Sequence, residues 1–129
     1  MVIQYILLQS EALISDENAA MIVADASMSF LSDKITKNLF KKVFSNVYCI
    51  SFDINEETVE WMQTGKKRIL LKVDNAEMLE NAIQKINGFG LQENTDYFRI
   101  ENNGSLFAVG FTPMNEKRVN NVIEKLQLN

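Results

Sequence analysis

Histidine is absent from this 129-residue sequence, and cysteine occurs once, at Cys49. The missing histidine excludes the Ser-His-Asp and Cys-His arrangements that activate many protein nucleophiles. It also removes the commonest zinc ligand, and one cysteine cannot complete a thiolate site, so we expect no metal. Neither glycine-rich phosphate-binding motif, G-x-x-x-x-G-K-[ST] or G-x-G-x-x-G, occurs, and we expect no cofactor.

Long apolar runs are absent as well, and none approaches the roughly 20 residues that a membrane helix needs. Residues 1–5 have neither a basic stretch nor a small-residue cleavage site, so they predict a strand rather than a signal peptide. A lone cysteine suits a reducing compartment and forbids an internal disulfide. These observations favour a cytoplasmic protein with no membrane partner.

Basic residues are fewer than acidic ones: the sequence has 13 Lys and Arg and 17 Asp and Glu, which gives a formal net charge of −4. An acidic balance disfavours nonspecific binding to nucleic acid, which relies on positive surface charge. A local basic patch is still compatible with this balance, since residues 34–42 include four lysines. A solvated helix face is the simpler interpretation of that patch.

The length is that of a single domain, and no linker or repeat divides it, so residues 1–129 are expected to form one domain. Alternating and continuous apolar runs predict strands, and Ser, Asp and Asn caps followed by helical periodicity predict helices. The resulting β-α-α-β-α-β-α-β-β-α order predicts an α/β fold of three layers, α/β/α. Its sheet is expected to be mixed and mostly parallel, with four to five strands and a C-terminal β-hairpin plus helix. The expected strands are 2–8, 47–54, 68–73, 97–101 and 106–111, and the expected helices start near residues 16, 33, 56, 75 and 116.

Two helix signals are specific enough to test. Ser32-Asp33 is expected to cap a separate second helix with Ile35, Leu39 and Val43 on one face. Asp74 with Glu77 has the spacing of a capping box. Two side chains are expected to be structural: Trp61 as an anchor between helix and sheet, and Cys49 as a small core residue.

A family resemblance runs through the second half of the chain. Residues 55–61, Asn-Glu-Glu-Thr-Val-Glu-Trp, precede a glycine, two lysines and an apolar strand at residues 65–73. Together with Ala19-Ala20 and the strand 107–111 before Pro113, this order resembles the type-2 peptidyl-tRNA hydrolases. The resemblance implies that family's fold and a homodimer, and residues 32–54 look like an insertion. Members of the family cleave the ester that joins a peptide to tRNA.

The residues at the family's functional positions differ here. The family's first helix opens with a G-K-x-A-A-Q-x-x-H-A pattern, and aligning its alanines with Ala19-Ala20 places Glu17 at the lysine. The same alignment places Met21 at the glutamine and Ala24 at the histidine. A lysine-to-glutamate exchange reverses the charge, so the role of that position cannot be retained.

The family's D-A-G-R-T loop has a looser counterpart here, with Glu101 at the aspartate and Ser105 at the threonine, and no arginine between them. Ester cleavage needs an activated water and stabilisation of developing negative charge. Under this alignment Glu17 and Glu101 supply at most a general base, and no cation occupies the matching position.

The candidate ligand- or partner-binding residues are Glu17, Lys66, Lys67, Glu101 and Ser105, and no residue is assigned a catalytic role. Each has a structural interpretation too. An acid in a helix's first turn is favoured by the helix dipole, a carboxylate near a turn is ordinarily solvated, and Lys66-Lys67-Arg68 suits the polar start of a buried strand as well as a phosphate site.

Three hypotheses follow. The first is a non-catalytic or altered member of the fold that serves as a binding or regulatory module, with its site near the carboxyl ends of the strands. The alternative is an active peptidyl-tRNA hydrolase, the only case in which tRNA is a partner. A third is a small inhibitory protein that contacts a protein partner through residues 32–54.

Overall fold

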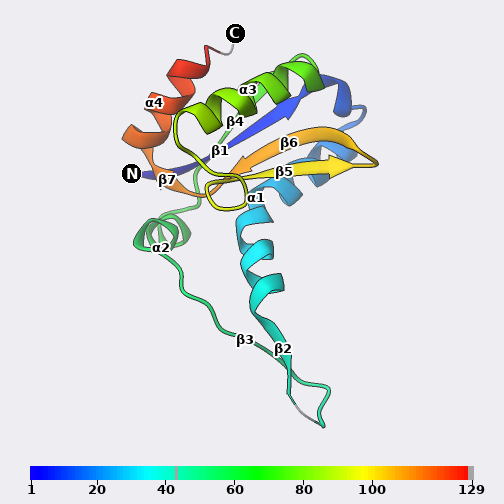
Figure 1. The fold of residues 1–129 in the computed structure, drawn as a ribbon, viewed down its shortest axis with the longest axis vertical. Coiled ribbons are helices and arrows are strands. Elements are labelled where there is room, and N and C mark those ends of the chain that lie inside the picture. Colours follow the sequence, from blue (N-terminus) through cyan, green and yellow to red (C-terminus); the bar gives the residue numbers. More distant parts are fainter. Residues whose placement is uncertain (43, 128–129) are drawn as a thin grey trace.

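The computed structural model describes residues 1–42 and 44–127 (Figure 1). A central sheet of five strands has the order β4-β1-β6-β5, and β7 pairs with the start of β1. A separate ribbon is made of β2 and β3. The strands are β1 Val2–Gln9, β2 Leu39–Lys41, β3 Tyr48–Ile50, β4 Arg68–Val73, β5 Tyr97–Asn102, β6 Ser105–Phe111 and β7 Met114–Asn115. The helices are α1 Asp16–Asn38, α2 Glu56–Gln63, α3 Ala76–Gly88 and α4 Glu116–Leu126, with a short 3₁₀ helix at Ser10–Ala12.

The three-layer prediction is confirmed, and it rests on the central strand β1, whose residues are all buried. Because successive side chains of a strand point to opposite faces, Ile3 and Leu7 pack with α3 and α4, whereas Ile6 and Leu8 pack with α1. Figure 1 shows α3 and α4 on one side of the sheet and α1 on the other. The continuous apolar run of β1 therefore reflects burial on both faces.

The sheet is mixed, as predicted, but the expectation that it is mostly parallel is wrong. Among the described strands of this sheet, the β1–β4 pair is parallel, and β1–β6, β1–β7 and β5–β6 are antiparallel. The prediction fails because residues 47–54, expected as a strand of this sheet, do not join it. They form only the three-residue β3, which pairs with β2 outside the central sheet.

Helix α1 is one continuous helix of 23 residues, so the expected helix boundary at Ser32-Asp33 is wrong. Ser15 caps it by accepting a hydrogen bond from the Asn18 backbone N–H at 3.0 Å, so the helix begins where expected, near residue 16. Ser and Asp disfavour a helix interior only slightly, and burial of Phe30 beside Trp61 favours continuation through this point. Leu39 lies in β2, and Val43 lies outside the described residues.

One of the remaining three helix caps differs from its prediction. Asn55 and Asn115 cap α2 and α4, so these helices begin where expected, near residues 56 and 116. Helix α3, however, is capped by Asn75, which accepts a hydrogen bond from the Met78 N–H at 2.9 Å, and not by Asp74.

Within the described residues, none of the helices has the length and apolarity needed to span a bilayer.

Gly110 explains how closely α1 lies on the sheet. A Cβ built there would sit 2.0 Å from the Ala26 carbonyl oxygen of α1. A contact of that length forbids any side chain at this position. Glycine on β6 and small residues on the facing helix, Ala26 and Ser27, therefore set the spacing between the two layers.

The segment 32–54 divides into two parts. Residues 32–38 complete α1, and the ribbon β2–β3 with its connection to α2 projects from the body of the protein (Figure 1). Cys49 is half-buried in β3, so its assignment to the core is wrong. Trp61 is an anchor as expected, because it is buried and meets Phe30 edge to face at 5.9 Å.

Candidate functional site

A cavity of about 560 Å³ opens at the N-terminus of α1, beside the end of β5, and we call it the acidic cavity. Glu17 reaches it from the first turn of α1, and Asp25 reaches it from the same face of the helix, two turns later. Glu101 comes from the end of β5, where the pairing with β6 shifts register. Its apolar lining is Ile14, Met21, Ile22, Ile100 and Phe107, and Ser15, Asn18 and Asn102 complete it.

The charged residues that line this cavity are all acidic. Its described lining includes three carboxylates, from Glu17, Asp25 and Glu101, and neither lysine nor arginine. Glu17 and Asp25 are exposed. Like charges around a shared hollow repel one another, so a positively charged group placed there would be attracted.

Glu101 is hydrogen-bonded to a cation, Arg99, that also binds a second carboxylate. Arg99 Nε donates to the Glu101 carboxylate at 2.7 Å, and the same guanidinium binds Glu80 of α3 through two nitrogens. The hydrogen bonds to Glu80 and then to Glu101 raise the pKa of Arg99 further above its ordinary value. A guanidinium held by two carboxylates is not free to stabilise a third anion.

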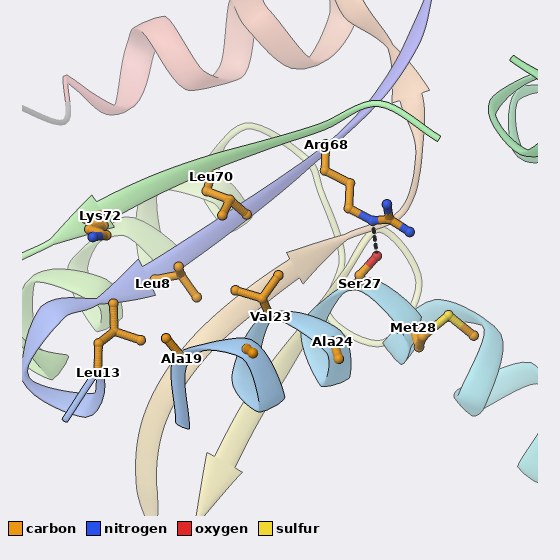
Figure 2. A pocket seen from close by; sticks show the side chains of 11 residues that line it. Leu8, Leu13, Ala19, Val23, Ala24, Ser27, Met28, Arg68, Leu70 and Lys72 are labelled. Carbon is orange, nitrogen blue, oxygen red and sulfur yellow. Dashed lines mark hydrogen bonds between the residues drawn. The ribbon is translucent and has the colours of Figure 1, made fainter. Parts of the chain in front are cut away.

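A second cavity, of about 590 Å³, lies on the other flank of α1, between that helix and β4 (Figure 2). We call it the apolar cavity. Two cations, Arg68 and Lys72, come from β4. The remaining lining is Leu8, Leu13, Ala19, Ala20, Val23, Ala24, Ser27, Met28 and Leu70.

A chain of hydrogen bonds crosses from β4 to α1 beside the apolar cavity. Arg68 Nε donates to Ser27 Oγ at 2.6 Å, and Ser27 Oγ donates to the buried Gln4 Oε1 at 2.7 Å. Figure 2 shows the Arg68 side chain extending from β4 to Ser27. The guanidinium also lies 5.2 Å from the centre of the Trp61 ring. Arg68 is thereby held in one orientation.

The candidate residues named from the sequence separate into two groups. Glu17 and Glu101 line the same cavity, although Glu101 lies within β5 rather than in a turn. Lys66 and Lys67 lie exposed between α2 and β4, and Ser105 begins β6. None of these three described residues lines either cavity.

Sequence reasoning missed Asp25 and Ser27 as members of these cavities, and it named Arg68 only within the Lys66-Lys67-Arg68 run. Asp25 had a usable signal, because it follows Glu17 by eight residues and so shares its helix face. Gln4 offered another, since a glutamine inside an apolar strand predicts a buried hydrogen-bond partner. Nothing in the sequence connects Arg68 with Ser27, which are 41 residues apart.

The two cavities differ in the charge of their lining residues. Acidic residues line the acidic cavity, two cations line the apolar cavity, and α1 lies between them. No cluster of three potential metal ligands occurs among residues 1–42 and 44–127.

Comparisons with known proteins agree with this architecture. Residues 2–129 match the family model described as peptidyl-tRNA hydrolase PTH2, which covers essentially the whole chain. A search of the curated proteins finds no significant match.

Proposed function

This chain belongs to the peptidyl-tRNA hydrolase PTH2 family, and from that premise we propose that it is a non-hydrolytic binding module whose acidic cavity accepts a cationic, partly apolar group. One observation carries the proposal: the charged residues in the described lining of that cavity are all acidic, and Glu17 and Asp25 are exposed there, while Glu101 is paired with Arg99. The proposal includes a cytoplasmic location, which is supported by the lone cysteine because a free thiol suits a reducing compartment.

The reaction of the family argues against hydrolysis at this site. Cleavage of the ester between peptide and tRNA develops negative charge on the carbonyl oxygen, and enzymes stabilise that charge with fixed donors or cations. Carboxylates at the same place would repel both the oxyanion and the phosphates of tRNA. Glu17 therefore opposes the chemistry that a lysine at its position would assist.

The apolar lining indicates which cations fit. Ile14 and Met21 are largely exposed at the cavity, the latter by 63%. A small inorganic cation would leave these surfaces in water, whereas a lysine stem or an aromatic residue next to a lysine would cover them. The best-matched ligand is thus a peptide segment that carries lysine and a bulky apolar residue.

An active hydrolase is the competing hypothesis, and Arg68 and Lys72 are the observation that favours it. These cations border a cavity large enough for an aminoacyl group. Under that hypothesis they would neutralise the tRNA terminus. The general base would have to come from a carboxylate on the other flank of α1, which weighs against it.

The first test is hydrolysis of an N-blocked aminoacyl-tRNA by the purified full-length chain. We expect release at the rate of buffer alone. Turnover that exceeds the buffer rate and disappears in Glu17→Gln or Glu101→Gln would overturn the proposal. Arg68→Ala, tested in parallel, separates a contaminating activity from one that depends on this chain.

The second test measures binding of a short peptide amide with two lysines and one phenylalanine. We expect the double variant Glu17→Gln, Asp25→Asn to weaken binding about tenfold, because two charge pairs are lost. The matched control is Glu77→Gln, which removes an exposed first-turn glutamate from α3. Equal affinity in all three proteins would contradict a role for the acidic cavity.

A further inference from the structure

The apolar cavity exists because α1 covers only part of its side of the sheet. Gly110 lets the helix approach closely at Ala26, so α1 lies over β6 and β5. Strand β4 is at the opposite edge, beyond β1, and extends past the flank of the helix. Figure 2 shows Leu70 of β4 and Val23 of α1 pointing into the space that remains. The α1 side chains on this flank are too small to fill it, because they include Ala19, Ala20 and Ala24.

Strand β4 has one covered face and one uncovered face. Successive side chains of a strand alternate, and Ile69 and Leu71 pack against the cluster beneath α3 and α4. The alternate set lines the apolar cavity and consists of Arg68, Leu70 and Lys72. Leu70 is 47% exposed and belongs to none of the hydrophobic clusters of the described chain. With Met28 of α1, which is 45% exposed, it forms an apolar surface left in water.

Cations border this apolar surface, and acids do not. Among the described residues that line the cavity, the charged ones are Arg68 and Lys72. They lie on the same face of an extended strand, roughly 13 Å apart along it. A ligand that covered the apolar surface and carried a negative charge at one end would gain both burial and a charge pair. Charge complementarity therefore favours an amphipathic anion over a neutral or cationic molecule.

Arg68 is oriented to receive such an anion. Its Nε donates to Ser27 Oγ, and its Nη1 donates to the Lys66 carbonyl oxygen at 3.3 Å. A guanidinium has more N–H donors than these two bonds use, and Nη2 has no hydrogen-bond partner in the described part of the chain. Because Ser27 already fixes the side chain, little conformational entropy is lost when an anion binds. Lys72 is exposed and less constrained, so Arg68 is the better anchor.

We propose that the apolar cavity binds an unbranched alkyl carboxylate of medium length, with the carboxylate on Arg68 and the hydrocarbon chain lying along α1 toward Ala19 and Leu13. The chain covers Leu70 and Val23, and the Lys72 stem lies beside its far end. This site is distinct from the acidic cavity, with which it shares no lining residue among those described. The inference therefore goes beyond the proposed function and does not depend on it.

The lining favours a hydrocarbon chain over a peptide. Besides the two cations, the described lining offers one polar side chain, Ser27, and its hydroxyl already accepts from Arg68 and donates to Gln4. A peptide placed here would lose water from its N–H and C=O groups without gaining side-chain partners. A methylene chain carries no such groups. The described lining has no aromatic residue either, so it lacks a stacking surface for nucleic-acid bases.

Calorimetric titration of the full-length chain with hexanoate, octanoate and decanoate tests the ligand class. Complete burial of one methylene is worth about fourfold in affinity. Since Leu70 and Met28 border a partly open cavity, we expect about fivefold for each added pair of methylenes. Octanol lacks the carboxylate and N-acetyl-leucine adds an amide, so each should bind about tenfold more weakly than octanoate. Equal affinity for octanoate and either compound, or no dependence on chain length, would refute the assignment.

Charge removal tests the anchor. Arg68→Gln should weaken octanoate binding about tenfold, because a charge-assisted hydrogen bond is lost. Lys72→Gln should weaken it only about twofold, since an exposed ion pair contributes little. The control Lys67→Gln removes a neighbouring exposed charge outside the cavity and should bind like the unaltered chain. A loss at Lys67 equal to that at Arg68, or a larger loss at Lys72, would contradict the proposed orientation.

Filling the cavity tests the site without removing a charge, and it remains informative if Arg68→Gln disturbs the fold. Ala24 is exposed on α1 and lines the cavity, so Ala24→Phe places a ring in the space for the hydrocarbon chain. Octanoate affinity should fall at least about tenfold, because the buried methylenes lose their place. Gln84→Phe adds the same ring at an exposed position of α3 and is the matched control. Undiminished binding by Ala24→Phe would rule out this cavity.

Methionine methyl groups report where octanoate binds. In protein with isotope-labelled methionine, the Met28 methyl resonance should shift on titration. Met21, which lines the acidic cavity, and Met78 on α3 should not shift. A shift of Met21 in place of Met28 would move the ligand to the acidic cavity and overturn the inference. The double variant Glu17→Gln, Asp25→Asn should bind octanoate no more weakly than the unaltered chain, so the two proposals succeed or fail separately.

Discussion

Arg68 and Ser27 are joined by a hydrogen bond of 2.6 Å that connects the edge strand β4 to helix α1. Ser27 Oγ in turn donates a hydrogen bond to Gln4 Oε1 in the central strand β1. The bond fixes the cation on one flank of α1, away from the carboxylates that line the acidic cavity on the other flank. This separation is the physical basis of the proposed non-hydrolytic role.

Arg68→Ala should lower the free energy of unfolding by about 1 kcal/mol. The variant loses a charge-assisted hydrogen bond and the contact with Trp61, but Arg68 is exposed and partly screened by water. Urea unfolding followed by tryptophan fluorescence measures the change. Lys67→Ala is the neighbouring control, and an equal loss there would contradict a specific role for the Arg68–Ser27 bond.

Gln4→Leu should be more damaging, by about 2–4 kcal/mol. Gln4 Nε2 donates to the carbonyls of Ser27 and Phe111 at 2.8 and 2.9 Å, and all three groups are buried. Leucine would leave two carbonyl oxygens and the Ser27 hydroxyl without this partner. Thermal unfolding of the purified variant checks the prediction, and an unchanged midpoint temperature would contradict it.

Gly110→Ala should destabilise the fold by about 3 kcal/mol or more, because the added methyl group meets the Ala26 carbonyl at 2.0 Å. Helix α1 would have to move off the sheet. Gly88→Ala is the control, since an added Cβ there meets nothing within 4 Å and the residue ends α3. Its expected effect is at most about 1 kcal/mol, of stabilising sign. Denaturant titration measures the free energy of unfolding of both variants, and an equal effect of the two substitutions would contradict the prediction.

The raised pKa of the Tyr97 phenol predicts how the free energy of unfolding changes with pH in the alkaline range. Burial, followed by the nearby Glu93 carboxylate, raises the pKa of its phenol above the ordinary value of about 10. The folded state therefore holds the proton more tightly than the unfolded state. The resulting stabilisation is complete below pH 10 and is lost as the pH rises from there through the folded pKa.

Tyr97→Phe removes both this titration and the hydrogen bond from the phenol to Asn87 Oδ1. We expect the variant to be less stable at pH 8, by about 1 kcal/mol. Above pH 10 its stability should fall less steeply than that of the unaltered chain. Tyr5 also has a raised pKa and donates to Asn120, so it retains part of the slope. Parallel slopes for the two proteins would contradict the assignment to Tyr97.

The order of elements could be predicted from local patterns. The apolar run of β1, the caps Ser15, Asn55 and Asn115, and the turn at residues 103–104 each act over a few residues. The charge reversal at Glu17 is also a local observation, because it follows from aligning Ala19-Ala20 with the two alanines of the family's first-helix pattern. These are short-range properties, and the chain carries them whatever its partners in space.

The sequence alone therefore determined the α/β class, the family resemblance and the acidic character of the start of α1. Tertiary structure decided which strands pair, that residues 47–54 leave the sheet, and that α1 runs unbroken past Ser32. It also decided that Glu17, Asp25 and Glu101 share a cavity while Arg68 faces another. The reason is that pairing and convergence depend on contacts between residues far apart in the chain, and local propensity carries no information about those distances.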